Sequence, residues 1–101
     1  MNIFDLPALP LPEESTTVLA GGRGVRIERI VSAGQSSDWY DQEEAEFVAL
    51  LEGSAVIAYA DGRSAALEKG DTLLIHPHER HRVESTSAQP PCVWLCVFFV
   101  T

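Results

Sequence analysis

Short hydrophobic runs broken by turn residues recur roughly every 8–12 residues along this chain, a spacing typical of β-strands. The pattern predicts strands over residues 16–20, 25–31, 46–59, 64–67, 72–76, 81–85 and 93–100. Gly53 divides the longest run into two strands, and Asp61-Gly62 is a strong hairpin signal. No stretch has a sustained helical period. The chain is therefore predicted to be all-β, folded as a sandwich or a barrel.

Several predicted strands are hydrophobic on both faces, as residues 47–51 and 95–99 illustrate. One face can fill the interior, and the other needs cover from a second sheet, from the N-terminal segment or from a partner. We therefore expect a homodimer. Residues 1–14 contain three prolines and are predicted to form an extended arm. Residues 15–101 are predicted to form one barrel domain, because 101 residues allow a single core.

Two glycine-bounded blocks carry the candidate chemistry. In the first, Gly34 is followed after five residues by Tyr40, then by Gln42 and Glu46, and Gly53 follows after six more. This block resembles the first conserved motif of cupins, in which two histidines stand at the positions of Tyr40 and Gln42.

The second block resembles the second cupin motif. It runs from Gly70 through His76, His78 and His81 to Ser85. The histidine of that motif is kept at His81, whereas His76, His78 and Ser85 replace its proline, glycine and asparagine. The resemblance covers about residues 25–99 and implies a cupin-like barrel, a double-stranded β-helix of the jelly-roll type.

The resemblance also implies a partly kept metal site. Cupins that hold a metal bind it through three histidines and one glutamate, so Glu46 and His81 match ligand positions. Because two ligands hold a metal poorly, a third would come from Gln42, His78, Tyr40 or His76. Imidazole and carboxylate groups suit a divalent transition metal such as Fe, Mn, Ni or Zn.

Tyr40 and Trp94, together with Trp39, are candidates for an aromatic wall at the mouth of the pocket. Residues at i and i+2 of a strand share a face, so Tyr40 and Gln42 would point the same way if that segment is regular.

The charge balance argues against two classes of partner. Fifteen acidic residues against seven basic ones give a net charge of −8, which repels nucleic acid and anionic membrane surfaces. No apolar stretch is long enough to span a bilayer, and the N-terminus lacks the basic region of a secretory signal. If their segment is a strand, Cys92 and Cys96 lie ~13 Å apart, too far for a disulfide. Reduced thiols favour a cytoplasmic protein.

Three functions stay open, because the fold alone does not define activity. The first is a barrel that binds a small molecule, with a metal at Glu46 and His81 that is weak or absent. The second is a metal-dependent enzyme, such as a dioxygenase or an isomerase acting on a small polar substrate. The third is a metal-free, epimerase-like barrel that uses His81 and Tyr40 as a base and acid pair. Whether the protein is an enzyme is left open by the sequence.

Overall fold

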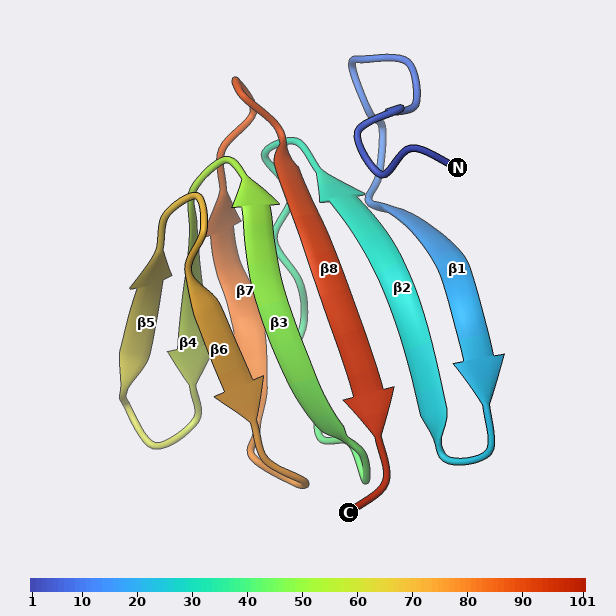
Figure 1. Ribbon diagram of the computed structural model, residues 1–101. Helices are drawn as coiled ribbons and strands as arrows, with labels where there is room; N and C mark the ends of the chain where they lie inside the picture. Colours follow the sequence, from blue (N-terminus) through green and yellow to red (C-terminus); the bar gives the residue numbers. More distant parts are fainter.

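The computed structural model describes residues 1–101 and contains eight strands and no helix (Figure 1). The strands are β1 (Ser15–Gly22), β2 (Val25–Ser32), β3 (Ala45–Glu52), β4 (Ala55–Tyr59), β5 (Ser64–Leu67), β6 (Thr72–Ile75), β7 (His81–Thr86) and β8 (Cys92–Phe99). The predicted all-β class is confirmed. The segment before β3, residues 39–44, is irregular apart from a bridge between Tyr40 and His81.

The strands form two antiparallel sheets that face each other. The larger sheet has the order β1-β2-β8-β3-β6, and the smaller sheet has the order β5-β4-β7. Neighbours in sequence often belong to different sheets: the turn at Gly53 carries the chain from β3 to β4, and the turn at Gly70 returns it from β5 to β6. Asp61-Gly62 instead joins the paired strands β4 and β5, as the hairpin signal predicts.

The core fills the space between the sheets. Alternate residues of β8 point inward, so Cys92, Trp94 and Cys96 are each at most 4% exposed. They pack in one cluster with inward residues of the other strands, including Leu50 of β3 and Ile57 of β4. Both cysteines are free thiols.

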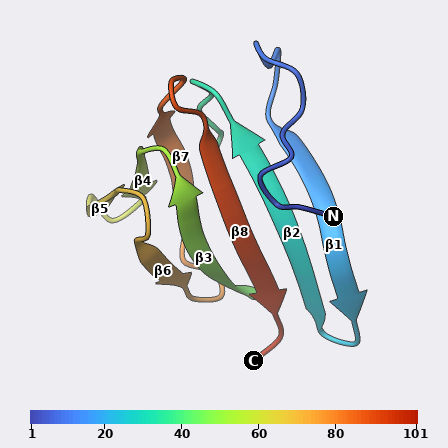
Figure 2. The same ribbon diagram turned by 45° about the horizontal axis from the view of Figure 1, so that its top comes forward.

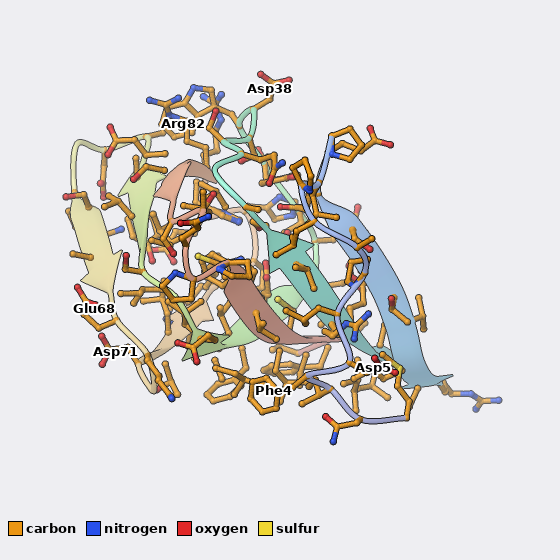
Figure 3. The ribbon with its side chains drawn as sticks, turned by 90° about the horizontal axis from the view of Figure 1, so that it is seen from above. Phe4, Asp5, Asp38, Glu68, Asp71 and Arg82 are labelled. Carbon is orange, nitrogen blue, oxygen red and sulfur yellow. The ribbon has the colours of Figure 1, made fainter.

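Residues 1–14 fold back over β1 and β2 instead of running straight (Figure 2). A turn forms where the Asp5 N–H donates to the Asn2 carbonyl at 3.0 Å. Arg29, which is 5% exposed on the outer face of β2, donates from Nη1 to the carbonyls of Asp5 (2.8 Å) and Ile3 (3.3 Å). In the view from above, Phe4 and Asp5 lie on one side of the molecule, and Asp38 and Arg82 lie on the other (Figure 3). The arm therefore covers part of the outer face of the larger sheet.

A hydrophobic row remains uncovered on that outer face. It consists of the register-paired residues Ile27, Val97, Phe47 and Leu74, from β2, β8, β3 and β6. Phe47 is 39% exposed and Leu74 is 45% exposed. The structure contains no helix that could cross a membrane.

Candidate functional site

A cavity of about 380 Å³ opens between the two sheets. Strand alternation determines its lining, because every second residue of each strand points between the sheets. Ile57, Ile75 and Val83 contribute apolar wall, whereas Glu46 and His81 contribute groups that can exchange protons. Polar and ionisable side chains in a largely apolar, concave cavity are typical of a ligand site.

His81 is the first residue of β7 and is 4% exposed. Its Nδ1 lies 2.8 Å from the carbonyl oxygen of Glu79. A carbonyl only accepts, so Nδ1 carries a proton and donates it. In the neutral ring, the lone pair is then on Nε2, which lies 3.8 Å from Oε1 of Glu46. This distance is too long for a direct hydrogen bond, so Nε2 is free to accept a proton from a bound molecule.

Glu46 points inward from β3 and is 8% exposed. The side-chain amide of Gln42 donates to its Oε1 at 3.3 Å. Burial raises the pKa of the Glu46 carboxyl above its ordinary value, although His81, the Cys96 thiol and Gln42 partly oppose this rise. Burial also raises the pKa of Cys96 far above that of a free thiol, so this cysteine stays protonated beside Glu46.

Tyr40 reaches the cavity from the irregular segment before β3. Its backbone pairs with His81 through two hydrogen bonds, from Tyr40 N to His81 O (2.7 Å) and from His81 N to Tyr40 O (3.1 Å). The two rings lie 5.6 Å apart between centroids. Burial, followed by the charge of Glu14, raises the pKa of the phenol. Tyr40 therefore remains a proton donor at neutral pH.

Two consecutive hydrogen bonds hold Trp94 in the cavity wall. Its indole Nε1 donates to the hydroxyl of Ser32 at 3.0 Å, and that hydroxyl donates to Oε2 of Glu14 at 3.2 Å. Burial raises the pKa of Glu14 as well, against the effect of the Ser32 hydrogen bond. These hydrogen bonds fix the indole ring and place the Glu14 carboxylate in the lining of the cavity.

The structure brings together five of the eight residues singled out from the sequence and leaves His78, Trp39 and the exposed His76 outside the cavity. Tyr40, Gln42, Glu46, His81 and Trp94 all line the cavity. His78 does not: it lies in the turn after β6, has a φ of 60°, and its exposed ring places Nδ1 2.7 Å from Oδ1 of Asp41. Trp39 also lies outside the cavity, next to the guanidinium groups of Arg80 and Arg82.

The residues present do not form a complete metal site. No group of three or more histidine, cysteine, aspartate or glutamate side chains is arranged to hold a metal ion. Gln42 turns its amide N–H toward Glu46, so it acts as a donor where a metal ligand would have to be an acceptor. Glu46 and His81 alone therefore provide two ligands, which is fewer than transition-metal sites in proteins use.

Four charged lining residues were not singled out from the sequence. They are Glu14, Arg26, Glu28 and Glu44. The alternation of Val25 and Ile27 with charged neighbours was visible in the sequence. It does not reveal which face lines the interior, and here Arg26 and Glu28 face the cavity whereas Ile27 lies in the hydrophobic row outside.

Two facing antiparallel sheets around a central cavity, with inward-facing glutamate and histidine, define a small jelly-roll barrel of the cupin type. The cupin domain family model matches residues 27–98, so the chain belongs to the cupin family. No curated protein sequence is significantly similar to the chain.

Solved structures agree with this assignment. A Ralstonia eutropha JMP134 protein provisionally named mannose-6-phosphate isomerase is 36% identical and superposes with a TM-score of 0.93, covering 100% of this chain and 97% of that one. A cupin superfamily protein from Desulfitobacterium hafniense DCB-2 is 20% identical with a TM-score of 0.78, covering 89% and 80%. A predicted oxalate decarboxylase from Thermotoga maritima is 19% identical with a TM-score of 0.74, covering 87% and 81%. The last two show the shared fold alone. The names of the Ralstonia eutropha and Thermotoga maritima proteins carry different activities, an isomerase and an oxalate decarboxylase.

Replacing Glu46 with glutamine is expected to change the pH dependence of stability. A carboxyl whose pKa is raised by folding favours the folded state below its unfolded pKa, near 4.5, and this contribution is lost as pH rises through the folded pKa. The gain in unfolding free energy of Glu46→Gln over wild type should therefore grow as pH rises from 4.5 toward neutral. Urea denaturation across this range measures it. Exposed Glu43→Gln is the control and should give a flat difference; an equally flat result for Glu46→Gln would contradict the burial of this carboxyl.

Proposed function

We propose that the protein binds a small molecule in the cavity between its sheets and exchanges protons with it through His81. One observation carries the proposal: Nε2 of His81 faces Glu46 across 3.8 Å in the cavity wall, while the Glu79 carbonyl holds Nδ1. This hydrogen bond fixes the ring and its tautomer, as acid-base catalysis requires.

The roles follow from the protonation of each group. His81 Nε2 is the base that takes a proton from carbon next to a carbonyl group of the bound molecule. Tyr40, whose pKa is raised, is the donor to the carbonyl oxygen. His81 then returns the proton to the former carbonyl carbon, and the hydroxyl group on the deprotonated carbon gives its proton back to Tyr40 as it becomes the new carbonyl, which completes an isomerisation without loss or gain of atoms. Returning the proton to the opposite face of the same carbon would give epimerisation. The reaction class is therefore that of a metal-independent isomerase or epimerase.

Binding can be tested by NMR on methyl-labelled, chelator-treated protein with a library of small polar fragments. We expect fragments to shift the methyl signals of Ile57, Ile75 and Val83, which line the cavity. Val83→Phe narrows the cavity and should weaken these shifts, whereas Val56→Phe, on the opposite face of the smaller sheet from Ile57, should not. Equal binding to both variants, or binding only at the outer faces, would contradict the proposal.

The name of the Ralstonia eutropha relative suggests aldose–ketose isomerisation of a sugar phosphate. The reaction type agrees with the proposed roles of His81 and Tyr40. A phosphate group on the substrate fits the cavity less well. The cavity wall contains one arginine, Arg26, which is already paired with Glu28 and Glu44. We therefore propose the proton-transfer chemistry and not the phosphorylated substrate.

A metal-dependent reaction is the second candidate, because Glu46 and His81 stand at the positions of two cupin metal ligands and both line the cavity. These two residues would hold a divalent Fe, Mn, Ni or Zn ion, which would supply Lewis-acid chemistry at the bound molecule. Elemental analysis of untreated protein separates the two candidates. One metal ion per chain that disappears in a His81→Gln variant would favour the metal-dependent reaction.

We also propose that the protein is a homodimer that pairs through the hydrophobic row on the larger sheet. Among the outward residues of β2, β3, β6 and β8, the one acidic side chain is Glu52 at the end of β3, whose Oε2 is paired with Lys69 Nζ at 3.5 Å, although the chain carries a net charge of −8. A second copy is therefore the natural occupant, because two such faces can meet without repulsion between carboxylates.

The variant Phe47→Glu is expected to convert this dimer to a monomer. It places one carboxylate per chain in the middle of the hydrophobic row, where pairing would bury two like charges. Size-exclusion chromatography with light scattering should give twice the 11.0 kDa chain mass for wild type and the single chain mass for the variant. The control Val56→Glu, on the outer face of the smaller sheet, should remain dimeric. A wild-type monomer would overturn this proposal.

The cysteines support the expected cytoplasmic location. Cys92 and Cys96 are buried and unpaired. Free thiols of this kind are typical of proteins in a reducing compartment.

A further inference from the structure

Acidic side chains outnumber basic side chains in the wall of the cavity. Four glutamates line it, namely Glu14, Glu28, Glu44 and Glu46, against one arginine, Arg26. Even with His81 protonated, carboxylates outnumber cationic side chains. The sign of this imbalance bears on which molecules can enter.

Arg26 is already paired with acidic residues of the same wall. Its Nε lies 2.7 Å from Oε2 of Glu28 and its Nη1 lies 3.1 Å from Oε2 of Glu44. The guanidinium carbon also stacks 4.4 Å from the centre of the Phe98 ring. Its Nε, its Nη1 and one face of the guanidinium plane are therefore already engaged, and the wall contains no second arginine and no lysine for an incoming phosphate or carboxylate.

Two glutamates remain without a cationic partner of this kind. Glu14 accepts a hydrogen bond from the Ser32 hydroxyl. Glu46 accepts one from the Gln42 amide and faces His81 Nε2 at 3.8 Å. His81 is 4% exposed, and its Nε2 has no hydrogen-bond partner although the ring lines the cavity. An unpartnered ring nitrogen that faces the cavity, on a histidine this deeply buried, is an independent sign that the cavity receives a ligand.

The rest of the wall is aromatic and apolar. Trp94, Phe98 and Tyr40 supply rings, and Ile57, Ile75 and Val83 supply aliphatic surface. Aromatic faces attract ammonium groups, and the attraction is stronger where water is excluded. Carboxylates beside aromatic rings in one concave site are the combination that recognises an organic cation.

We propose that the molecule bound in this cavity is an organic cation, a small amine or ammonium compound with an apolar body, whose charge is recognised by Glu14 and Glu46 and by the surrounding aromatic rings. The body of the molecule lies against the aliphatic wall, within reach of His81. This inference rests on the proposed use of the cavity as a ligand site and adds the charge of the ligand to it.

The test compares three probes that share a phenyl ring and differ in charge: 2-phenylethylamine, 2-phenylethanol and 3-phenylpropionate. Each is titrated into the intact, methyl-labelled protein at pH 7, and the shifts of the Ile57 and Val83 methyl signals give the dissociation constant. We expect the amine to bind at least about tenfold more tightly than the alcohol, and the carboxylate not to bind, because only the ammonium gains charge-assisted hydrogen bonds and cation–π contacts.

Variants locate the charge recognition. Glu14→Gln and Glu46→Gln should each reduce the preference for the amine over the alcohol, and exposed Glu43→Gln should leave it unchanged. Glu14→Gln serves as the second variant if Glu46→Gln alters the cavity. Binding of the alcohol or the carboxylate as tightly as the amine would overturn the inference while leaving the cavity as a ligand site. Failure of all three probes to shift the cavity signals would also overturn it, and the fragment titration described above then decides separately whether the cavity binds ligands.

Discussion

Replacing Gly53 with alanine is expected to lower the free energy of unfolding by about 3–5 kcal/mol. Gly53 has a φ of 90°, which L-residues adopt only with strain. An alanine Cβ there would lie 2.9 Å from the Cα of Cys92 and 2.8 Å from Oγ of Ser87. The Ser87 hydroxyl is itself held between the Ser54 N–H and the Pro90 carbonyl. Backbone of β8 would therefore have to move, and with it the strand that carries Trp94 and Cys96.

The matched control is Gly62→Ala. Gly62 has a similar φ of 97°, but no atom lies within 4 Å of the position of its Cβ. This variant should lose only the free energy of unfolding that corresponds to backbone strain, about 1–2 kcal/mol. Urea denaturation of both variants isolates the contribution of the close approach to Cys92. Equal losses in the two variants would show that the packing between the β3–β4 turn and the start of β8 is looser than described.

The fold could be predicted from the sequence because its signals are local. Period-two alternation, Gly53 and Asp61-Gly62 are each recognisable within a few residues, and every predicted strand exists with small shifts at its ends. The sequence could not predict which strands share a sheet. For example, β3 and β4 are adjacent in sequence but belong to different sheets. That choice depends on long-range packing, and so does the way the arm folds back onto Arg29.

The site was predictable only where it followed the spacing of the cupin motifs. That spacing identified Glu46, His81, Tyr40 and Gln42, all of which line the cavity. His78 differs because the turn at φ 60° directs its ring to Asp41 on the surface, a pairing between residues 37 positions apart. The role of Arg26 in the cavity wall also depends on a long-range contact, because its partner Glu44 is 18 positions away in sequence.

Replacing His81 with alanine is expected to reduce the rate of proton transfer to a bound molecule by about 100- to 10,000-fold, the usual contribution of a positioned general base. Tyr40 and Cys96 cannot take its place, because Tyr40 stays protonated and Cys96 is a protonated, buried thiol. His81→Gln keeps a polar side chain of similar size and should lose the same activity with less effect on folding. His78→Ala removes an exposed histidine that lies outside the cavity and should retain full activity.

Solvent deuterium exchange measures this proton transfer directly. Chelator-treated wild type, His81→Gln and His78→Ala are incubated in D₂O with glucose, mannose, fructose, their 6-phosphates and their amino-sugar counterparts, and NMR follows deuterium at the carbon next to the carbonyl group. We predict that wild type and His78→Ala introduce deuterium into at least one of these compounds and that His81→Gln does so at least about 100-fold more slowly. Exchange by wild type that is no faster than exchange by His81→Gln, across the whole set of compounds, would contradict the assignment of His81 as the proton-transfer group of the barrel.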